Sequence, residues 1–230
     1  MPTTDMRLVV LVDNEPGPGL RPDWGLSIYV DSGGWRALFD AGNDPAVLEF
    51  NAGRLGIDLG SLDFAVVSHH HLDHVGGFLG GGLFRKGLPV YVPPGPADRF
   101  ESAGLRPVVV ESTRELAPGA HAVGPLRAGH LQEMALALGP AGARALLVGC
   151  SHPGVDALAA RALRDLGGTL TFVMGGFHAP PRAVLDRLVE ISGSALICPG
   201  HCSGDAAKEY LRSAYPDRYC ELRSGLVIDV

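Results

Sequence analysis

The sequence feature that most constrains this chain is a histidine-rich run that directly follows an apolar segment. The run extends from Ser68 to His74 and contains the spacing His-x-His-x-Asp-His, at His69, His71, Asp73 and His74. Side chains two residues apart at a strand end point to the same side, so His69 and His71 can converge on one cation. After a turn, Asp73 and His74 could reach a second cation. Imidazole and carboxylate ligands suit Zn²⁺ first, with Fe or Mn as alternatives.

Around this run, short β-type segments alternate with helical ones, which predicts an α/β fold. No linker or low-complexity tract divides the chain, so we expect one domain over residues 1–230. The predicted strands are residues 6–13, 25–31, 35–39, 64–68, 89–92, 108–111, 131–138, 143–148, 169–174, 195–198 and 226–230, and the predicted helices are residues 45–55, 155–166, 181–191 and 206–214.

The composition favours a cytoplasmic protein that acts on a small molecule. The chain is 46% hydrophobic and 19% charged, as globular proteins are. Its apolar runs fall far short of the ~20 residues of a membrane helix, and its first residues lack the blocks of a secretory signal. A net charge of −6 without a basic stripe argues against a nucleic-acid partner. The sequence leaves the oligomeric state open.

With the histidine-rich run, the chain resembles the metallo-β-lactamase superfamily, whose motif is that His-x-His-x-Asp-His pattern. Residues 39–42 read Phe-Asp-Ala-Gly and resemble the early Asp-x-Gly signature of the superfamily. The resemblance implies an αββα sandwich of two mixed β-sheets flanked by helices. It also implies that Asp40 orients a metal ligand through a hydrogen bond.

Four further segments resemble one subgroup of that superfamily. The subgroup includes the archaeal dihydropterin–ribofuranosylaminobenzene phosphate synthase and many bacterial hydrolases without a settled substrate. The segments are Val-Asp-Asn-Glu at 12–15, Gly-Cys-Ser-His at 149–152, Gly-Gly-Phe-His at 175–178 and His-Cys-Ser-Gly at 201–204.

The resemblance also supplies the remaining metal ligands. His152 would join the first two histidines of the motif at one cation, and His201 would join Asp73 and His74 at the other. Most members have an aspartate that bridges the two metals where this chain has Cys150. Cys150 is therefore either a thiolate ligand or a small buried residue behind the site. The predicted metal ligands are His69, His71, Asp73, His74, His152 and His201.

The predicted function is that of a metal-dependent hydrolase or related transferase with a small substrate, phosphorylated or not. Two divalent cations, Zn²⁺ with Mn²⁺ or Fe²⁺ as alternatives, would bind a water and lower its pKa towards 7. Asp73 would orient the resulting hydroxide. His178 would protonate the leaving group or hold the substrate oxyanion.

Three other interpretations stay open. The activity named for the subgroup joins a pterin diphosphate ester to an arylamine with loss of diphosphate. A non-catalytic metal or redox sensor would need an accessible thiol of low pKa, for which Cys150 is the candidate. A nuclease on the same fold would lack a basic surface. In addition, backbone N–H groups of residues 151–154 could hold an anionic group of the substrate, whereas Glu133 and Asp13 have no clear role.

Overall fold

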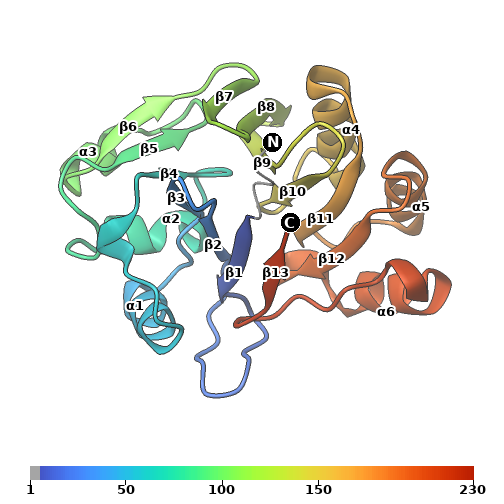
Figure 1. Cartoon of the computed structure of the whole chain (residues 1–230), viewed down its shortest axis with the longest axis horizontal. Coiled ribbons are helices and arrows are strands. Elements are labelled where there is room, and N and C mark those ends of the chain that lie inside the picture. The colour runs from blue at the N-terminus through green and yellow to red at the C-terminus, as the bar shows by residue number, and fades with distance from the viewer. Residues whose placement is uncertain (1–5) are drawn as a thin grey trace. The chain divides into compact units, whose positions relative to one another are not determined.

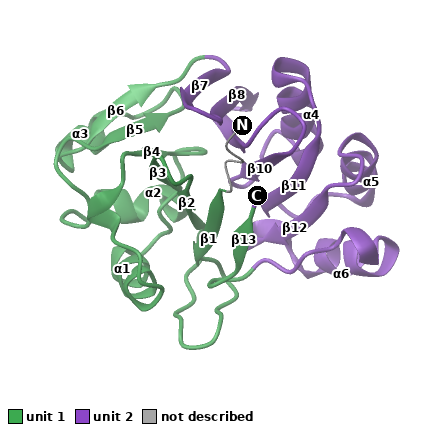
Figure 2. Cartoon of the chain, in the orientation of Figure 1, with its two compact units in different colours: residues 1–111, 223–229 green, residues 112–222, 230 purple. Residues whose placement is uncertain are grey.

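The structure, a computed structural model, describes residues 6–230. They form two compact units, each with its own mixed β-sheet (Figures 1 and 2). Unit 1 runs to Glu111 and also includes Arg223–Asp229, whereas unit 2 includes Ser112–Leu222. None of the helices in the described part of the chain combines the length and the apolar character needed to cross a membrane.

Unit 1 contains a seven-stranded sheet with the order β13-β1-β2-β3-β4-β5-β6. Strands β13, β1, β2 and β3 pair antiparallel, and β3, β4, β5 and β6 pair parallel. Its elements are β1 (Arg7–Val12), β2 (Ser27–Asp31), β3 (Arg36–Phe39), α1 (Pro45–Arg54), η1 (Leu59–Ser61), β4 (Phe64–Val66), α2 (Leu72–Leu79), β5 (Pro89–Val92), α3 (Asp98–Ser102), β6 (Arg106–Val109) and β13 (Val227–Asp229).

Unit 2 contains a six-stranded sheet with the order β12-β11-β10-β9-β8-β7. Here β7 to β10 pair antiparallel, and β10, β11 and β12 pair parallel. Its elements are β7 (Arg114–Ala117), β8 (Ala120–Ala128), β9 (Leu131–Leu138), β10 (Arg144–Val148), α4 (Val155–Leu166), β11 (Leu170–Gly176), α5 (Arg182–Ile191), β12 (Leu196–Gly200), η2 (His201–Ser203), α6 (Asp205–Ala214) and η3 (Pro216–Arg218).

Each unit buries the apolar stripes of its helices against its own sheet. In unit 1, Leu48 of α1 and Phe78 of α2 belong to one buried cluster with strand residues such as Leu38. In unit 2, Leu158 of α4 belongs with Val173 of β11 to a second cluster. Burying apolar side chains in this way is the main stabilising contribution to such a layer.

The parallel part of each sheet determines where polar side chains gather. The carboxyl ends of parallel neighbours meet at one edge, outside which α/β proteins bind their ligands. In unit 1, Asp40 directly follows β3, and Ser68 lies two residues beyond β4. In unit 2, Cys150, His178 and His201 follow β10, β11 and β12 within two residues. Each unit therefore has side chains of the metal-binding type at the carboxyl ends of its parallel strands.

Most predicted elements are confirmed within a few residues. Strands β2 and β3 pair antiparallel, as do β9 and β10, each close to its predicted range, and α4 has the predicted bounds. Asp44 caps α1, where its carboxylate accepts a hydrogen bond from the backbone N–H of Ala46 at 2.8 Å. The expected single domain over residues 1–230 stays a prediction.

A turn was predicted after His71, and the structure has the first turn of helix α2 at this point, a helix that was not predicted. Gly76 and Gly77 lower the helix propensity of this segment, so local sequence patterns did not indicate a helix. Both are needed for packing. A Cβ at Gly76 would lie 2.0 Å from the carbonyl oxygen of Asn43, and one at Gly77 would lie 2.3 Å from that of Ala41. Helix α3 and strands β7 and β8 were not predicted either, and the internal Gly124-Pro125 of β8 is untypical of a strand.

Candidate metal centre

Asp40 anchors the histidine-rich run of unit 1. Its carboxylate, which is fully buried, accepts hydrogen bonds from the backbone N–H of Ser68 at 2.7 Å, the Ser68 hydroxyl at 2.6 Å and Nδ1 of His74 at 2.7 Å. The φ of Asp40 is 56°, a left-handed conformation that is costly for most non-glycine residues. The hydroxyl of Ser27 donates to the Asp40 carbonyl at 2.9 Å. Asp40 therefore fixes the end of β3, the loop after β4 and the first turn of α2.

These hydrogen bonds determine which nitrogen of two histidines carries a proton. The hydroxyl of Ser68 donates its only hydrogen to Asp40, so it accepts from Nδ1 of His69 at 2.9 Å. His74 likewise donates from Nδ1 to Asp40. In their neutral forms both rings then carry a lone pair on Nε2. Metal-ligating histidines are held in this way by a partner on the other ring nitrogen.

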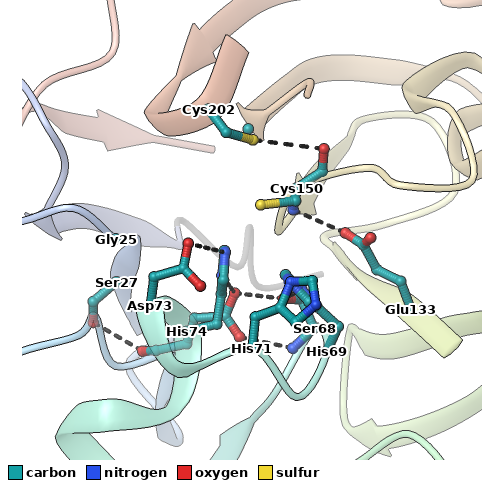
Figure 3. Close-up of polar contacts among 12 residues, drawn as sticks. Gly25, Ser27, Ser68, His69, His71, Asp73, His74, Glu133, Cys150 and Cys202 are labelled. Atoms are coloured by element: carbon teal, nitrogen blue, oxygen red, sulfur yellow. Dashed lines mark hydrogen bonds and ion pairs between the residues drawn. The ribbon is translucent and has the colours of Figure 1, made fainter. Parts of the chain in front are cut away.

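The donor atoms of unit 1 have spacings that fit a divalent cation. Nε2 of His69 lies 3.1 Å from Nδ1 of His71 (Figure 3). Two nitrogens bound to one tetrahedral zinc at about 2.0–2.1 Å lie about 3.3–3.4 Å apart. Oδ2 of Asp73 lies 3.8 Å from Nε2 of His74, so small side-chain rotations would bring this pair to the same spacing. The structure thus brings together, within unit 1, the four residues of the motif.

Glu133 on β9 organises the corresponding loop of unit 2. Its fully buried carboxylate accepts the backbone N–H groups of Cys150 at 2.9 Å, Ser151 at 2.6 Å and His152 at 2.8 Å. It also accepts Nδ1–H of His152 at 2.9 Å. The imidazole of His152 is therefore held like that of His74, with Nε2 as its second nitrogen. The sequence alone gave no clear role for Glu133.

This loop geometry corrects one sequence-based hypothesis. Backbone N–H groups of residues 151–154 are not presented to an anion, because Glu133 accepts two of them and the Ser151 carbonyl accepts that of Gly154 at 2.8 Å. The remaining residue is Pro153, which has no N–H, and α4 begins only at Val155. A buried carboxylate of the chain itself thus occupies the position expected for the anion.

His178 lies in a loop that is joined to η2. Both His178 and Ala179 have left-handed backbones, with φ of 54° and 44°. The N–H of Ala179 donates to the carbonyl of Cys202 at 3.0 Å, and the N–H of Phe177 donates to the hydroxyl of Ser203 at 3.0 Å. The loop after β11 is therefore fixed to the loop after β12.

His201 and Cys202 begin η2 directly after β12. His201 is buried and left-handed, with a φ of 43°. Gly176 on β11 leaves room for this pair, because a Cβ there would lie 2.7 Å from Sγ of Cys202 and 3.2 Å from Cδ2 of His201. Sγ of Cys202 in turn lies 3.8 Å from the carbonyl oxygen of Cys150 (Figure 3).

The four cysteines of unit 2 form two contacting pairs with different acidities. The hydrogen bond with Cys150, the charge of His201 and the hydrogen bond with His178 lower the pKa of Cys202 to about 6, against the effect of burial. Burial raises the pKa of Cys198 well above its usual value, and its contact with Cys220 adds to the rise. Cys150 itself is only 3% exposed, which does not favour the accessible thiol that redox sensing requires.

His70, which lies between two residues of the motif, forms hydrogen bonds in a separate network of unit 1. Its Nε2 donates to the carbonyl of Pro93 at 2.8 Å, while Arg99 donates to its Nδ1 at 3.1 Å and to its carbonyl at 2.6 Å. Burial lowers the pKa of His70, and the charge of Arg99 adds to the shift. The network fixes the backbone between His69 and His71.

Comparison with known proteins identifies the family. The chain matches the family model described as metallo-beta-lactamase superfamily over residues 21–201. It belongs to that superfamily. A curated relative from Methanocaldococcus jannaschii, 7,8-dihydropterin-6-methyl-4-(beta-D-ribofuranosyl)-aminobenzene-5'-phosphate synthase, is 26% identical over 90% of this chain and 91% of its own length.

Solved structures show the same fold. Tm1679, a metal-dependent hydrolase of the beta-lactamase superfamily, superposes with a TM-score of 0.84 at 24% identity, covering 98% of this chain and 99% of that one. The metallo-beta-lactamase fold protein YhfI from Bacillus subtilis has a TM-score of 0.67 at 15% identity, covering 97% and 99%. The predicted superfamily, the resemblance to the synthase subgroup and the fold class of two mixed sheets flanked by helices are confirmed.

Proposed function

We propose that this protein is a metal-dependent hydrolase, or a related transferase, with a small substrate that is phosphorylated or not. The observation that carries the proposal is the anchoring of one imidazole in each unit by a buried carboxylate, Asp40 for His74 and Glu133 for His152. This arrangement fixes the tautomer of a metal-binding histidine and raises its basicity. The proposed ligands of two divalent cations, Zn²⁺ first with Mn²⁺ or Fe²⁺ as alternatives, are His69, His71, Asp73, His74, His152 and His201.

In the proposed reaction, residues of the chain direct the attacking water, assist the leaving group and hold the metal-binding imidazoles. Bound divalent ions supply Lewis acidity, which lowers the pKa of water and stabilises developing negative charge. The carboxylate of Asp73 accepts a hydrogen bond from the attacking water and sets its direction. His178 donates a proton to the leaving group or a hydrogen bond to the substrate oxyanion. Asp40 and Glu133 hold the imidazoles in place throughout.

The metal content of the protein tests this proposal. We expect two equivalents of divalent metal per chain, measured by mass spectrometry on protein purified without added metal. Both His71→Ala and His201→Ala should lower that content. A chain without metal, which regains none on addition of Zn²⁺, Mn²⁺ or Fe²⁺, would contradict the proposal.

The role of Asp73 has its own test. The variant Asp73→Asn should lower kcat towards a phosphodiester probe such as bis(4-nitrophenyl) phosphate by about 10²-fold or more, because the amide cannot direct the water in the same way. Its unfolding midpoint in urea should equal that of the wild type. A variant with wild-type kcat would remove Asp73 from the mechanism.

A second candidate is a synthase that condenses a pterin diphosphate ester with an arylamine. The observation in its favour is the 26% identity to the archaeal synthase over nearly the full length of both chains. Release of diphosphate from a dihydropterin methyl diphosphate, with and without an aminobenzene riboside phosphate, separates the two. Release that requires the arylamine indicates the synthase, and release with water alone indicates the hydrolase. The cytoplasmic location and the exclusion of nucleic acid stay predictions.

A further inference from the structure

A short segment after η3 pairs with β12, the edge strand of the unit 2 sheet. Ile197 of β12 and Tyr219 form an isolated parallel bridge, and the N–H of Cys220 donates to the carbonyl of Ile197 at 3.0 Å. Nε of Arg218 donates to the carbonyl of Ala195 at 2.5 Å. The segment is therefore held against β12 in a definite register.

This register places Cys198 beside Cys220, because each directly follows one partner of the bridge. Neighbouring strands lie about 4.8 Å apart, and a disulfide requires Cα atoms about 4.4–6.8 Å apart. Side chains alternate along a strand, so both cysteines point to the face opposite to that of Ile197 and Tyr219. Ile197 belongs to the buried cluster of unit 2, and Tyr219 packs against it. The backbone therefore permits a disulfide between the two cysteines.

The two thiols differ in exposure and in acidity. Cys198 is fully buried, whereas Cys220 is partly exposed, and neither forms a disulfide in the structure. The hydrogen bond with Cys198 lowers the pKa of Cys220, against the effect of burial, and burial raises the pKa of Cys198. Attack on a disulfide requires access and thiolate character. Cys220 is therefore suited to react first and Cys198 to react second, within the protein.

We propose that Cys220 and Cys198 form a site of reversible oxidation by a small disulfide such as glutathione disulfide. The Cys220 thiolate attacks one sulfur of this molecule, which breaks its S–S bond and releases one glutathione thiolate. The Cys198 thiol then loses its proton to solvent, and its sulfur attacks that of Cys220. This step forms the protein disulfide and releases the second glutathione thiolate. The small disulfide gains the two electrons that the protein thiols lose.

The protein disulfide would close a loop over residues 198–220. This loop contains η2 and helix α6, and the cross-link would restrict the unfolded chain there. The reaction uses none of the residues proposed as metal ligands, so the proposal does not depend on the proposed function.

Peptide mapping of the wild-type full chain tests this site. After incubation with glutathione disulfide and alkylation of the remaining thiols, we expect the peptide with Cys198 to be linked to the peptide with Cys220. Dithiothreitol should separate the two. The same incubation in denaturing urea should give mixed cysteine pairings, because the register is then lost. A folded chain without the linked pair, or with either cysteine linked instead to Cys150 or Cys202, would overturn the proposal.

Two variants test the order of the steps. In Cys198→Ala the second thiol is absent, so a glutathione adduct should accumulate on Cys220. In Cys220→Ser the partly exposed thiol is absent, so Cys198 should stay unmodified. Modification of Cys198 in that variant at the wild-type rate would overturn the proposal.

The matched control is Cys202→Ser, which removes another partly exposed cysteine of unit 2. It should still form the bond between Cys198 and Cys220, and loss of this bond in the control would contradict the proposal. Oxidised wild-type protein should also have a higher urea midpoint than reduced protein, because of the closed loop. A midpoint that does not rise on oxidation would contradict the expected constraint on the unfolded chain.

Discussion

Both units place metal-type side chains at the carboxyl ends of parallel strands, but they anchor them differently. In unit 1, Asp40 stands on the parallel edge itself and accepts three hydrogen bonds, and the donors are nitrogen and oxygen. In unit 2, Glu133 reaches the edge from the antiparallel part of its sheet and accepts four, and the donors include sulfur. The comparison indicates that a buried carboxylate can orient imidazoles from either part of a mixed sheet.

The largest expected effect is a loss of stability when either buried carboxylate is replaced by its amide, and we expect a larger loss at Glu133 than at Asp40. In Glu133→Gln, the amide group faces two N–H donors that then lack an acceptor, which should lower the free energy of unfolding by about 2–4 kcal/mol. In Asp40→Asn, the NH₂ group can be placed towards the single backbone N–H of Ser68, so the loss should be about half as large. Asparagine also tolerates the left-handed backbone of position 40. Equal losses in the free energy of unfolding, measured by urea denaturation, would contradict this difference between the two units.

The next prediction concerns the close contact between Gly176 and the sulfur of Cys202 in unit 2. The variant Gly176→Ala places a Cβ 2.5 Å from the carbonyl oxygen of Gly149 and 2.7 Å from Sγ of Cys202. Overpacking of this kind should cost about 1–3 kcal/mol in the free energy of unfolding. Gly142→Ala in the same unit is the control, because no atom lies within 4 Å of its added Cβ. A neutral Gly176→Ala would show that the loop after β12 is loosely held.

Two buried serines provide a third test. Ser68 connects Asp40 to His69, so Ser68→Ala should lower zinc affinity by about 10–100-fold, measured by competition with a chromophoric chelator. Ser203 only accepts the N–H of Phe177 and touches the Gly175 carbonyl, so Ser203→Ala should cost about 1 kcal/mol of stability without changing zinc affinity. Ser203→Thr keeps the hydroxyl and should restore that stability. Equal affinity changes in the two alanine variants would contradict this assignment.

The smallest expected effect is a gain in stability. Gly53 lies exposed near the end of α1, and a Cβ there would meet no atom within 4 Å. Gly53→Ala should therefore raise the free energy of unfolding by about 0.5–1 kcal/mol through helix propensity. An unchanged or lower urea midpoint would indicate that this end of the helix is already frayed.

Local sequence patterns predicted most of the fold and the residue types of the site, but not what holds the site together. Most strands and helix α4 followed from the alternation of short apolar segments, because that signal acts over a few residues. The contact of Glu133 with Cys150 joins β9 to the loop after β10 across 17 positions, and nothing local encodes it. The role of Asp40 came only from family resemblance.

The left-handed backbone conformations near the candidate site could not be predicted from the sequence either. Asp40, Ser151, His178, Ala179 and His201 all have positive φ values without being glycine. Such conformations are sustained by surrounding tertiary hydrogen bonds, like those of Asp40 with Ser68 and His74. Helix α2 was missed for a related reason, since close packing required glycines that local propensity counts against a helix.

The pairing of β13 with β1 has a consequence for how the chain can be rewired. Arg7 and Asp229 are register partners on neighbouring antiparallel strands, so a short linker can connect the two ends of the described β-structure. A circular permutant joined there and opened between Glu111 and Ser112 would encode each unit as one uninterrupted stretch. Its gene would place unit 2 first, so a ribosome would complete that unit before starting the other.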